Sequence, residues 1–321
     1  MHINNLANQK EGFVRQILIT GSEGLVGTHL TQALPTKGYK VQSLDVKFSP
    51  FQNNYGNILE MNGLRQAAQG CIGIIHLAAV SRVIWGERDP KQCWQTNVIG
   101  TQNVLQVALE QKHRPWVIFA SSREVYGQPT KLPANEESQL QPVNIYARSK
   151  VAAEQALNEA RTAGLRTAIV RLSNVYGSIN DHTDRVVPAF SRGAAMGTPL
   201  RVEGDKHTFD FTHISDTISG ILALIEVLVN GENQLPPIHL LTGRPTTLGQ
   251  LAELANAAGG NCSEMMMAPP RSFDVAHFYG DPSRAKALLG WSAQISIENG
   301  VQQLVKAFTA SMNKTSNRKT V

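Results

Sequence analysis

The feature that most limits the fold is an apolar strand running directly into three glycines spaced three apart. Residues 14–20 are mostly apolar, Gly21, Gly24 and Gly27 follow, and residues 28–34 have a helical pattern. A strand that turns sharply into a helix aims unpaired backbone N–H groups and the positive end of the helix dipole at one point, which suits a pyrophosphate. We expect Gly21 to form the tight turn, Gly24 to admit the phosphates and Gly27 to bring helix and strand together. The pattern predicts a dinucleotide site.

A second strand-like run, residues 39–44, ends in Asp45. An acidic side chain at this position can accept hydrogen bonds from the adenosine ribose hydroxyls, and it repels a 2′-phosphate. NAD is therefore expected in preference to NADP, although Lys47 weakens that preference. The alternative is an ordinary solvated carboxylate at a strand end.

Length and composition favour one large α/β domain with an appended lobe, because 321 residues with 42% hydrophobic content can bury a sizeable core. The cysteines Cys71, Cys93 and Cys262 are widely spaced and form no zinc or disulfide pattern, so we expect no metal site and a reduced, cytoplasmic setting. The most apolar later segment, residues 218–229, contains Glu226 and is too short to span a bilayer. No membrane association is expected.

The formal charge of +5 does not indicate nucleic-acid binding, because no basic stripe interleaved with aromatic residues is present. Three of the cations lie in a polar tail, at Lys314, Arg318 and Lys319. We expect residues 1–12 and 313–321 to be disordered tails.

Strand and helix alternate through the first half of the chain. Strand-like runs lie at 72–77, 116–121 and 167–172, with helical patterns at 90–111 and 145–163. Parallel strands need crossover connections, so this rhythm predicts an α/β fold with a doubly wound, Rossmann-like parallel sheet and helices on both faces.

From about residue 173 short strands and helices mix, which predicts a smaller mixed α/β C-terminal lobe over the carboxyl edge of the sheet, where ligands bind in such folds. We expect a dinucleotide-binding domain over 13–173, to which parts of later segments return, and a mainly substrate-binding lobe over 174–312. The patterns of this half are strands at 200–202, 209–213 and 238–240 and helices at 185–196, 215–229, 247–257 and 297–309.

The second informative feature is Tyr146 with Lys150 four residues later on a predicted helix. Positions i and i+4 share a helix face, and an ammonium near a phenol favours the phenolate, so the pair could do acid–base chemistry. Such a spacing is also common in surface pairs. Ser122 strengthens the functional interpretation, because it ends the strand at 116–121 on the edge where the cofactor is expected.

Taken in order, these motifs resemble the extended short-chain dehydrogenase/reductase superfamily, in its nucleotide-sugar epimerase/dehydratase branch. The resemblance runs nearly end to end and is carried by TGSEGLVG at 20–27, HLAA at 76–79, NVIGT at 97–101, SSREVYG at 121–127, YARSK at 146–150 and RLSNVYG at 171–177.

The resemblance implies that Tyr146 is the general base, that Lys150 lowers its pKa and holds the nicotinamide ribose, and that Ser122 hydrogen-bonds the reacting hydroxyl. It implies oxidation at C4 of a nucleotide-linked hexose with NAD, and a homodimer formed through the helices at 90–111 and 145–163. Expected NAD contacts are Gly21, Gly24, Leu25, Val26, Gly27, Asp45, Asn57, Ile58, Leu77, Ala78, Ala79, Asn97, Tyr146 and Lys150.

The substrate contacts that the resemblance implies include Arg271 as a phosphate clamp, because a guanidinium matches two phosphate oxygens. Relatives often have a pyrophosphate-binding arginine where this chain has Phe209. Arg185, Arg201 or His207 could replace it, or the substrate may have a different carrier. The full expected set is Ser81, Ser122, Asn174, Arg185, Val187, Arg201 and Arg271.

Glu124, two residues after Ser122, helps to distinguish between the possible reactions, since dehydratases and decarboxylases of the superfamily tend to have Glu at this position. Arg123 stands between them, and a guanidinium cannot protonate a leaving hydroxide at neutral pH. We therefore favour a 4-epimerase. The alternatives are a dehydratase or decarboxylase that uses Glu124, a sugar dehydrogenase or ketoreductase, and a non-enzymatic NAD-binding regulator or scaffold.

Overall fold

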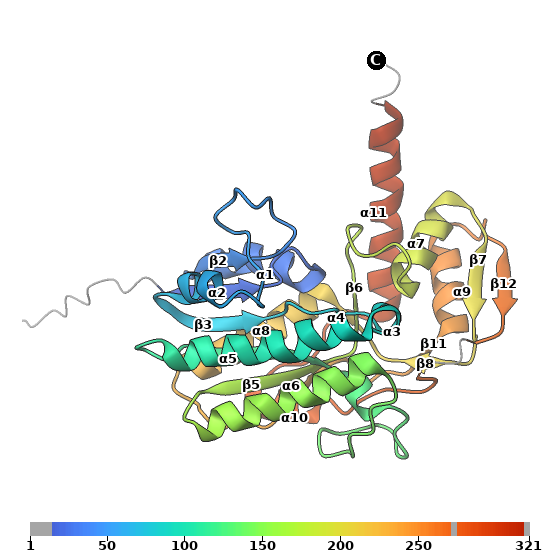
Figure 1. The fold of residues 1–321 in the computed structure, drawn as a ribbon. Helices are drawn as coiled ribbons and strands as arrows, with labels where there is room; N and C mark the ends of the chain where they lie inside the picture. The colour runs from blue at the N-terminus through green and yellow to red at the C-terminus, as the bar shows by residue number, and fades with distance from the viewer. Residues whose placement is uncertain (1–14, 271–274, 318–321) are drawn as a thin grey trace, which may run out of the picture.

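The structure, a computed structural model, describes residues 15–270 and 275–317. Six parallel strands form the central sheet (Figure 1), as the alternating pattern predicts, in the order β10-β5-β4-β3-β1-β2. The strands are β1 (Gln16–Thr20), β2 (Lys40–Leu44), β3 (Cys71–His76), β4 (Trp116–Ser122), β5 (Thr167–Leu172) and β10 (Ile238–Leu240).

Both faces of the sheet are covered, because successive side chains of a strand point to opposite faces. Ile17 and Ile19 pack on one face with α1 (Leu25–Thr36) and α8 (Ile214–Val229). Leu18 packs on the other face, against the helices α2 (Met61–Ala68), α5 (Gly100–Glu110) and α6 (Ile145–Thr162).

The helix expected at 90–111 is continuous but not uniform. It begins as α4 (Pro90–Trp94), with Asp89 as the N-cap, passes through a π-helical segment, η1 (Gln95–Ile99), and continues as α5. Asn144 caps α6 by accepting a hydrogen bond from Ala147 N at 2.8 Å. This cap fixes the start of the helix that carries Tyr146.

The C-terminal lobe is built on three helices with their own apolar core. Its strand pairs are β7 with β12, β8 with β11, and β6 with β9. The elements are β6 (Asn174–Tyr176), α7 (Val186–Met196), β7 (Leu200–Glu203), β8 (Thr208–Phe209), β9 (Phe211–His213), β11 (Thr246–Thr247), α9 (Leu248–Ala258), β12 (Met265–Ala268) and α11 (Ile297–Asn317).

One strand expected in the lobe is divided in the structure. The run at 209–213 breaks at Asp210, whose buried carboxylate accepts hydrogen bonds from Thr242 N, Thr242 Oγ1 and Gly243 N at 3.0, 2.7 and 2.8 Å. Asp210 therefore ties β8 and β9 to the chain that follows β10, and no alternating pattern signals such a bond.

Parts of the chain that follow the start of the lobe return to the central sheet, as we expected for the dinucleotide-binding domain. β10 is an edge strand of the central sheet rather than part of the lobe, and α8 and α10 (Ser283–Leu289) pack beside it. The expected tail at 313 is wrong in part, since α11 continues to Asn317 and projects beyond the rest of the molecule in Figure 1. The other expected tail, residues 1–12, lies outside the described residues.

Within the described ranges, none of the helices combines the length and apolar character needed to cross a membrane.

Candidate active site

The glycine turn lies where the order of the sheet reverses, since β2 and β3 flank β1 on opposite sides. Ligands bind at the carboxyl ends of strands at such a point. Gly21 has φ +75, and a Cβ there would lie 2.6 Å from Ala78 N; a Cβ on Gly27 would lie 2.3 Å from Gly21 O. A Cβ on Gly24 would meet only Gly21 O at 3.3 Å. Gly21 and Gly27 are thus needed for packing inside the turn. The missing side chain of Gly24 instead leaves the outer surface of the turn open.

The start of α1 fits the diphosphate of NAD. Among the described residues no side chain caps its N-terminus at Gly24, and its first turn, which includes Leu25 and Val26, carries no acidic residue. The Ser22 hydroxyl in the same turn is buried and has no hydrogen-bond partner in the described part of the chain. Free N–H groups at a helix N-terminus and an unmet hydroxyl are what a phosphate oxygen can satisfy.

Asp45 lies at the end of β2 beside this turn. Its carboxylate accepts hydrogen bonds from Glu23 N and Lys47 N, both at 2.9 Å, and Lys47 Nζ donates to Glu23 O at 3.1 Å. A carboxylate has about four acceptor positions, so it can hold the turn and still accept from ribose hydroxyls. The hydrogen bond of the Lys47 ammonium is to the backbone of the turn. The negative charge of Asp45 can therefore repel a 2′-phosphate on a cofactor.

We expect the protein to bind NAD at least about tenfold more tightly than NADP, because Asp45 repels a 2′-phosphate. Calorimetric titration with each cofactor tests this, and Asp45→Asn should narrow the ratio. Equal affinities, or tighter binding of NADP, would be incompatible with this role for Asp45.

The loop after β3 carries Leu77, Ala78 and Ala79 past the turn, where Ala78 N lies 3.4 Å from Thr20 Oγ1. Asn97, another expected cofactor contact, is buried, and its amide bonds both Val80 O and Val80 N, at 3.1 and 2.8 Å. Asn97 therefore holds the loop in place.

The other two expected cofactor residues lie after β2. Asn57 Oδ1 accepts from Leu59 N at 3.0 Å, and the Ile58 side chain is buried in the core. These contacts stabilise the local chain, and the Asn57 amide oxygen, which has two lone pairs, can still accept a second hydrogen bond.

Ser122, Tyr146 and Lys150 meet at the carboxyl end of β4. The hydroxyls of Ser122 and Tyr146 are hydrogen-bonded. Lys150 Nζ donates to Ala120 O at 2.9 Å and lies 5.9 Å from the centroid of the Tyr146 ring. All three side chains are buried, so the group is rigid and shielded from water.

The expected electrostatic effect of Lys150 is not found. Burial raises the pKa of Tyr146 to about 12, opposed by the hydrogen bond from Ser122, and the negative charge of Glu124 also raises it. Burial lowers the pKa of Lys150 itself to about 8. Both groups lose hydration in the same site, so a lysine four residues away does not by itself produce a readily ionised phenol.

Glu124 is buried and engaged at both carboxylate oxygens. It is the second residue of the 3₁₀ helix η2 (Arg123–Tyr126). Its Oε1 pairs with Arg123 Nη2 at 2.7 Å, and its Oε2 accepts a hydrogen bond from Asn144 Nδ2 at 3.2 Å. Its backbone N–H donates to Ser122 Oγ at 3.2 Å. Glu124 thus joins the serine to the cap of α6.

The residues that could replace an arginine at position 209 differ in their placement. Arg201 is 71% exposed at its side chain and pairs with Glu203 at 2.9 Å, so it faces solvent. His207 contacts the edge of the Phe209 ring. Arg185 lies near Tyr146, lowering its pKa, and its Nε is 3.8 Å from Asp181 Oδ1. Of the three, Arg185 is the one that the structure brings to the catalytic group.

The remaining expected substrate residues are dispersed. Asn174 donates to Asp210 O at 3.2 Å, the Val187 side chain is buried in the lobe core, and Ser81 is exposed. Arg271 lies outside the described residues.

A contact between the two halves of the molecule has no signal in the sequence. Arg82 forms an ion pair with Asp184 and lies over the Trp85 ring, 5.3 Å from its centroid. The ring of His182 meets Trp85 edge-on at 4.8 Å. The partners are about a hundred positions apart, so only the fold reveals that they are in contact.

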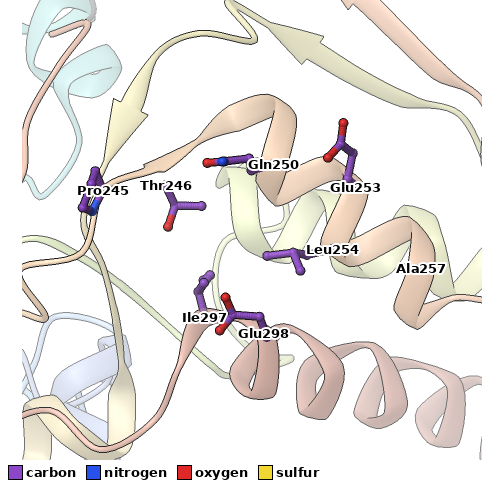
Figure 2. A pocket seen from close by; sticks show the side chains of 8 residues that line it. All are labelled: Pro245, Thr246, Gln250, Glu253, Leu254, Ala257, Ile297 and Glu298. Atoms are coloured by element: carbon purple, nitrogen blue, oxygen red, sulfur yellow. The ribbon is translucent and has the colours of Figure 1, made fainter.

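A separate pocket of about 420 Å³ lies in the lobe (Figure 2) and contains none of the expected site residues. It is surrounded by side chains from the segment just before α9, from α9 and from the first turn of α11: Pro245, Thr246, Gln250, Glu253, Leu254, Ala257, Ile297 and Glu298. No cluster of three or more metal-ligating side chains occurs among the residues that were searched, those with described placement.

A dinucleotide turn at the switch point of a parallel sheet, with Ser122, Tyr146 and Lys150 beside it, defines an NAD-dependent enzyme of the extended short-chain dehydrogenase/reductase type. The chain belongs to the NAD-dependent epimerase/dehydratase family, whose model matches residues 17–235.

Relatives extend over nearly the whole chain. It is 28% identical to a UDP-N-acetyl-alpha-D-glucosaminuronate decarboxylase of Bacillus cytotoxicus, over 92% of this chain and 98% of that protein. A UDP-glucose 4-epimerase of Pisum sativum is 25% identical, over 88% of this chain and 93% of that protein. The crystal structure of a Thermotoga maritima UDP-glucose 4-epimerase with UDP-glucose is 27% identical and superimposes with a TM-score of 0.84, over 92% and 99% of the two chains.

Proposed function

We propose that this protein is an NAD-dependent 4-epimerase of a UDP-linked hexose. The observation that carries the proposal is the buried Ser122–Tyr146–Lys150 group at the carboxyl end of β4, beside a dinucleotide turn, with Glu124 bound at both oxygens. UDP as the carrier is supported by the names of the relatives, which act on UDP-linked sugars.

Each residue of the group has a task in that reaction. Ser122 orients the C4 hydroxyl of the sugar, and Tyr146 takes its proton and later returns it. Lys150, held by Ala120 O, binds the nicotinamide ribose. NAD supplies the acceptor and donor of the hydride, so the C4 alcohol passes through a ketone. Return of the hydride to the opposite face of the sugar inverts C4.

Elimination is the main alternative, because Glu124 stands two residues after Ser122 and its charge acts on Tyr146. A base for removing the C5 proton needs a free lone pair and freedom to approach the sugar. The ion pair with Arg123 and the bond from Asn144 hold the Glu124 carboxylate in place, so they oppose its approach to the sugar. A decarboxylase would need no such base, so a uronate substrate also has to be tested.

Incubation in deuterated water with UDP-glucose, UDP-galactose and UDP-glucuronic acid tests the proposal. We expect the configuration at C4 to invert without incorporation of deuterium at C5 or C6. Nuclear magnetic resonance of the sugar measures both. Glu124→Gln should lower turnover less than about tenfold, because no C5 proton leaves in epimerisation. We expect no accumulation of reduced nicotinamide in this variant, which is measured by the absorbance of the reduced cofactor.

Three results contradict the epimerase: deuterium at C5 or C6, loss of the C6 carboxylate, or reduced nicotinamide trapped in Glu124→Gln. The first and third together identify a dehydratase, and the second identifies a decarboxylase. A protein that binds NAD but reduces none of it with any of these sugars fits the scaffold alternative.

We further propose a homodimer formed through the helices that carry the catalytic residues. α5 and α6 lie side by side on one face of the sheet (Figure 1), and α4 packs against α6. Trp94 and Ile99, at the ends of α4 and η1, are 39% and 42% exposed, which leaves apolar surface for a second copy.

A further inference from the structure

Arg123 is a buried cation that the catalytic mechanism does not use. It follows Ser122 directly, is 9% exposed, and lies between two aromatic rings. Its guanidinium carbon is 4.7 Å from the centroid of Phe209 and 5.7 Å from that of Phe278. The lobe residue Phe209 therefore contacts the end of β4, so the guanidinium lies where the two halves of the molecule meet.

The guanidinium is only partly satisfied. Nη2 pairs with Glu124 Oε1 at 2.7 Å, but Nη1 is buried and has no hydrogen-bond partner among the described residues. A buried donor without an acceptor is costly, and more so on a charged group. Arginine has five N–H donors in a planar fork, so Glu124 on one side leaves room for a second acceptor on the other.

The other arginines expected at the substrate are placed differently from Arg123. Arg201 faces solvent, and Arg185 lies beside Asp181. Phe209 brings no charge of its own to the junction of sheet and lobe, but its ring holds the guanidinium of Arg123 there. Cation–π contact with two rings and the ion pair with Glu124 fix the orientation of Arg123 in advance, which suits recognition of a ligand rather than a mobile surface charge.

We propose that Arg123 binds an oxyanion of the nucleotide-sugar substrate, through Nη1, and so selects the substrate next to Ser122. The inference rests on the proposed function. Two sources can supply the oxyanion, a carboxylate on the sugar or the diphosphate of the nucleotide. Nη1 is buried in this structure, so the substrate has to expose it in order to bind there.

Calorimetric titration of the NAD-loaded protein with UDP, UDP-glucose and UDP-glucuronic acid tests the proposal. Two variants are compared with the wild type: Arg123→Lys, which keeps the charge but loses the fork, and Arg123→Met with Glu124→Gln, which removes the ion pair without leaving a buried unpaired charge. Arg65→Met is the matched control, because Arg65 forms an exposed ion pair with Glu110 at 2.8 Å on the protein surface.

Loss of a charge-assisted hydrogen bond should weaken binding at least about tenfold in the double variant. If the affinity falls for UDP-glucuronic acid alone, the acceptor is the sugar carboxylate; if it falls equally for all three ligands, the acceptor is the diphosphate. Unchanged affinities, or weaker binding of NAD together with the sugars, overturn the proposal, the second because it indicates general damage. Wild-type protein that binds none of the three ligands refutes the proposed function instead.

Discussion

Replacing Tyr146 by phenylalanine is expected to lower turnover at least about a hundredfold while leaving NAD binding unchanged. The substitution removes the hydroxyl that takes the sugar proton and keeps the ring, which is packed in the core at the start of α6. Steady-state turnover and calorimetric titration with NAD measure the two effects separately.

Tyr39→Phe is the matched control, since it deletes a phenol hydroxyl that donates to Glu226 Oε1 at 3.2 Å, just before β2. It should retain full turnover. If Tyr146→Phe were equally active, Tyr146 would have no part in proton transfer, and Ser122 would have to be tested as the acid–base group.

The second large effect concerns alanine substitutions at two glycines of the same turn. We expect one of them to affect mainly stability and the other mainly NAD binding. Gly27→Ala should destabilise the fold by several kcal/mol, because its Cβ would lie 2.3 Å from Gly21 O and neither backbone can move away. Gly24→Ala should lower the melting temperature far less than Gly27→Ala, since its Cβ meets only Gly21 O, at 3.3 Å. It should weaken NAD binding about tenfold or more, by occupying the space of the phosphates.

Thermal unfolding without cofactor and calorimetric titration with NAD separate the two outcomes. A Gly24→Ala protein that binds NAD as tightly as the wild type would show that the diphosphate does not pass over this residue. A stable Gly27→Ala protein would mean that α1 can shift relative to β1.

Local hydrophobic patterns predicted the strand and the helix that carry the catalytic residues. The strand at 116–121 became β4, with Ser122 at its end, and the helix at 145–163 became α6, with Tyr146 and Lys150 one turn apart. These expectations depended on spacing along one chain segment, which secondary structure converts directly into geometry. The order of the glycine turn and these motifs also sufficed to indicate the family.

Expectations about the environment of a residue were less accurate. Asn97 holds the loop at Val80 through its amide, and Val187 lies in the lobe core. The pKa of Tyr146 is raised rather than lowered, because burial outweighs any effect of Lys150. Burial and hydrogen-bond partners depend on which distant segments meet, and a single sequence without homologues does not record these contacts.

The amino-acid sequence by itself determined the parallel sheet, the dinucleotide turn and the shared helix face of Tyr146 and Lys150, because each follows from periodicity, glycine spacing or position on one helix. Only the tertiary structure decided the state of Glu124 and Arg123. Their neighbours Asn144 and Phe209 are brought to them by long connections, and the charge and freedom of a buried side chain depend on the partners that surround it.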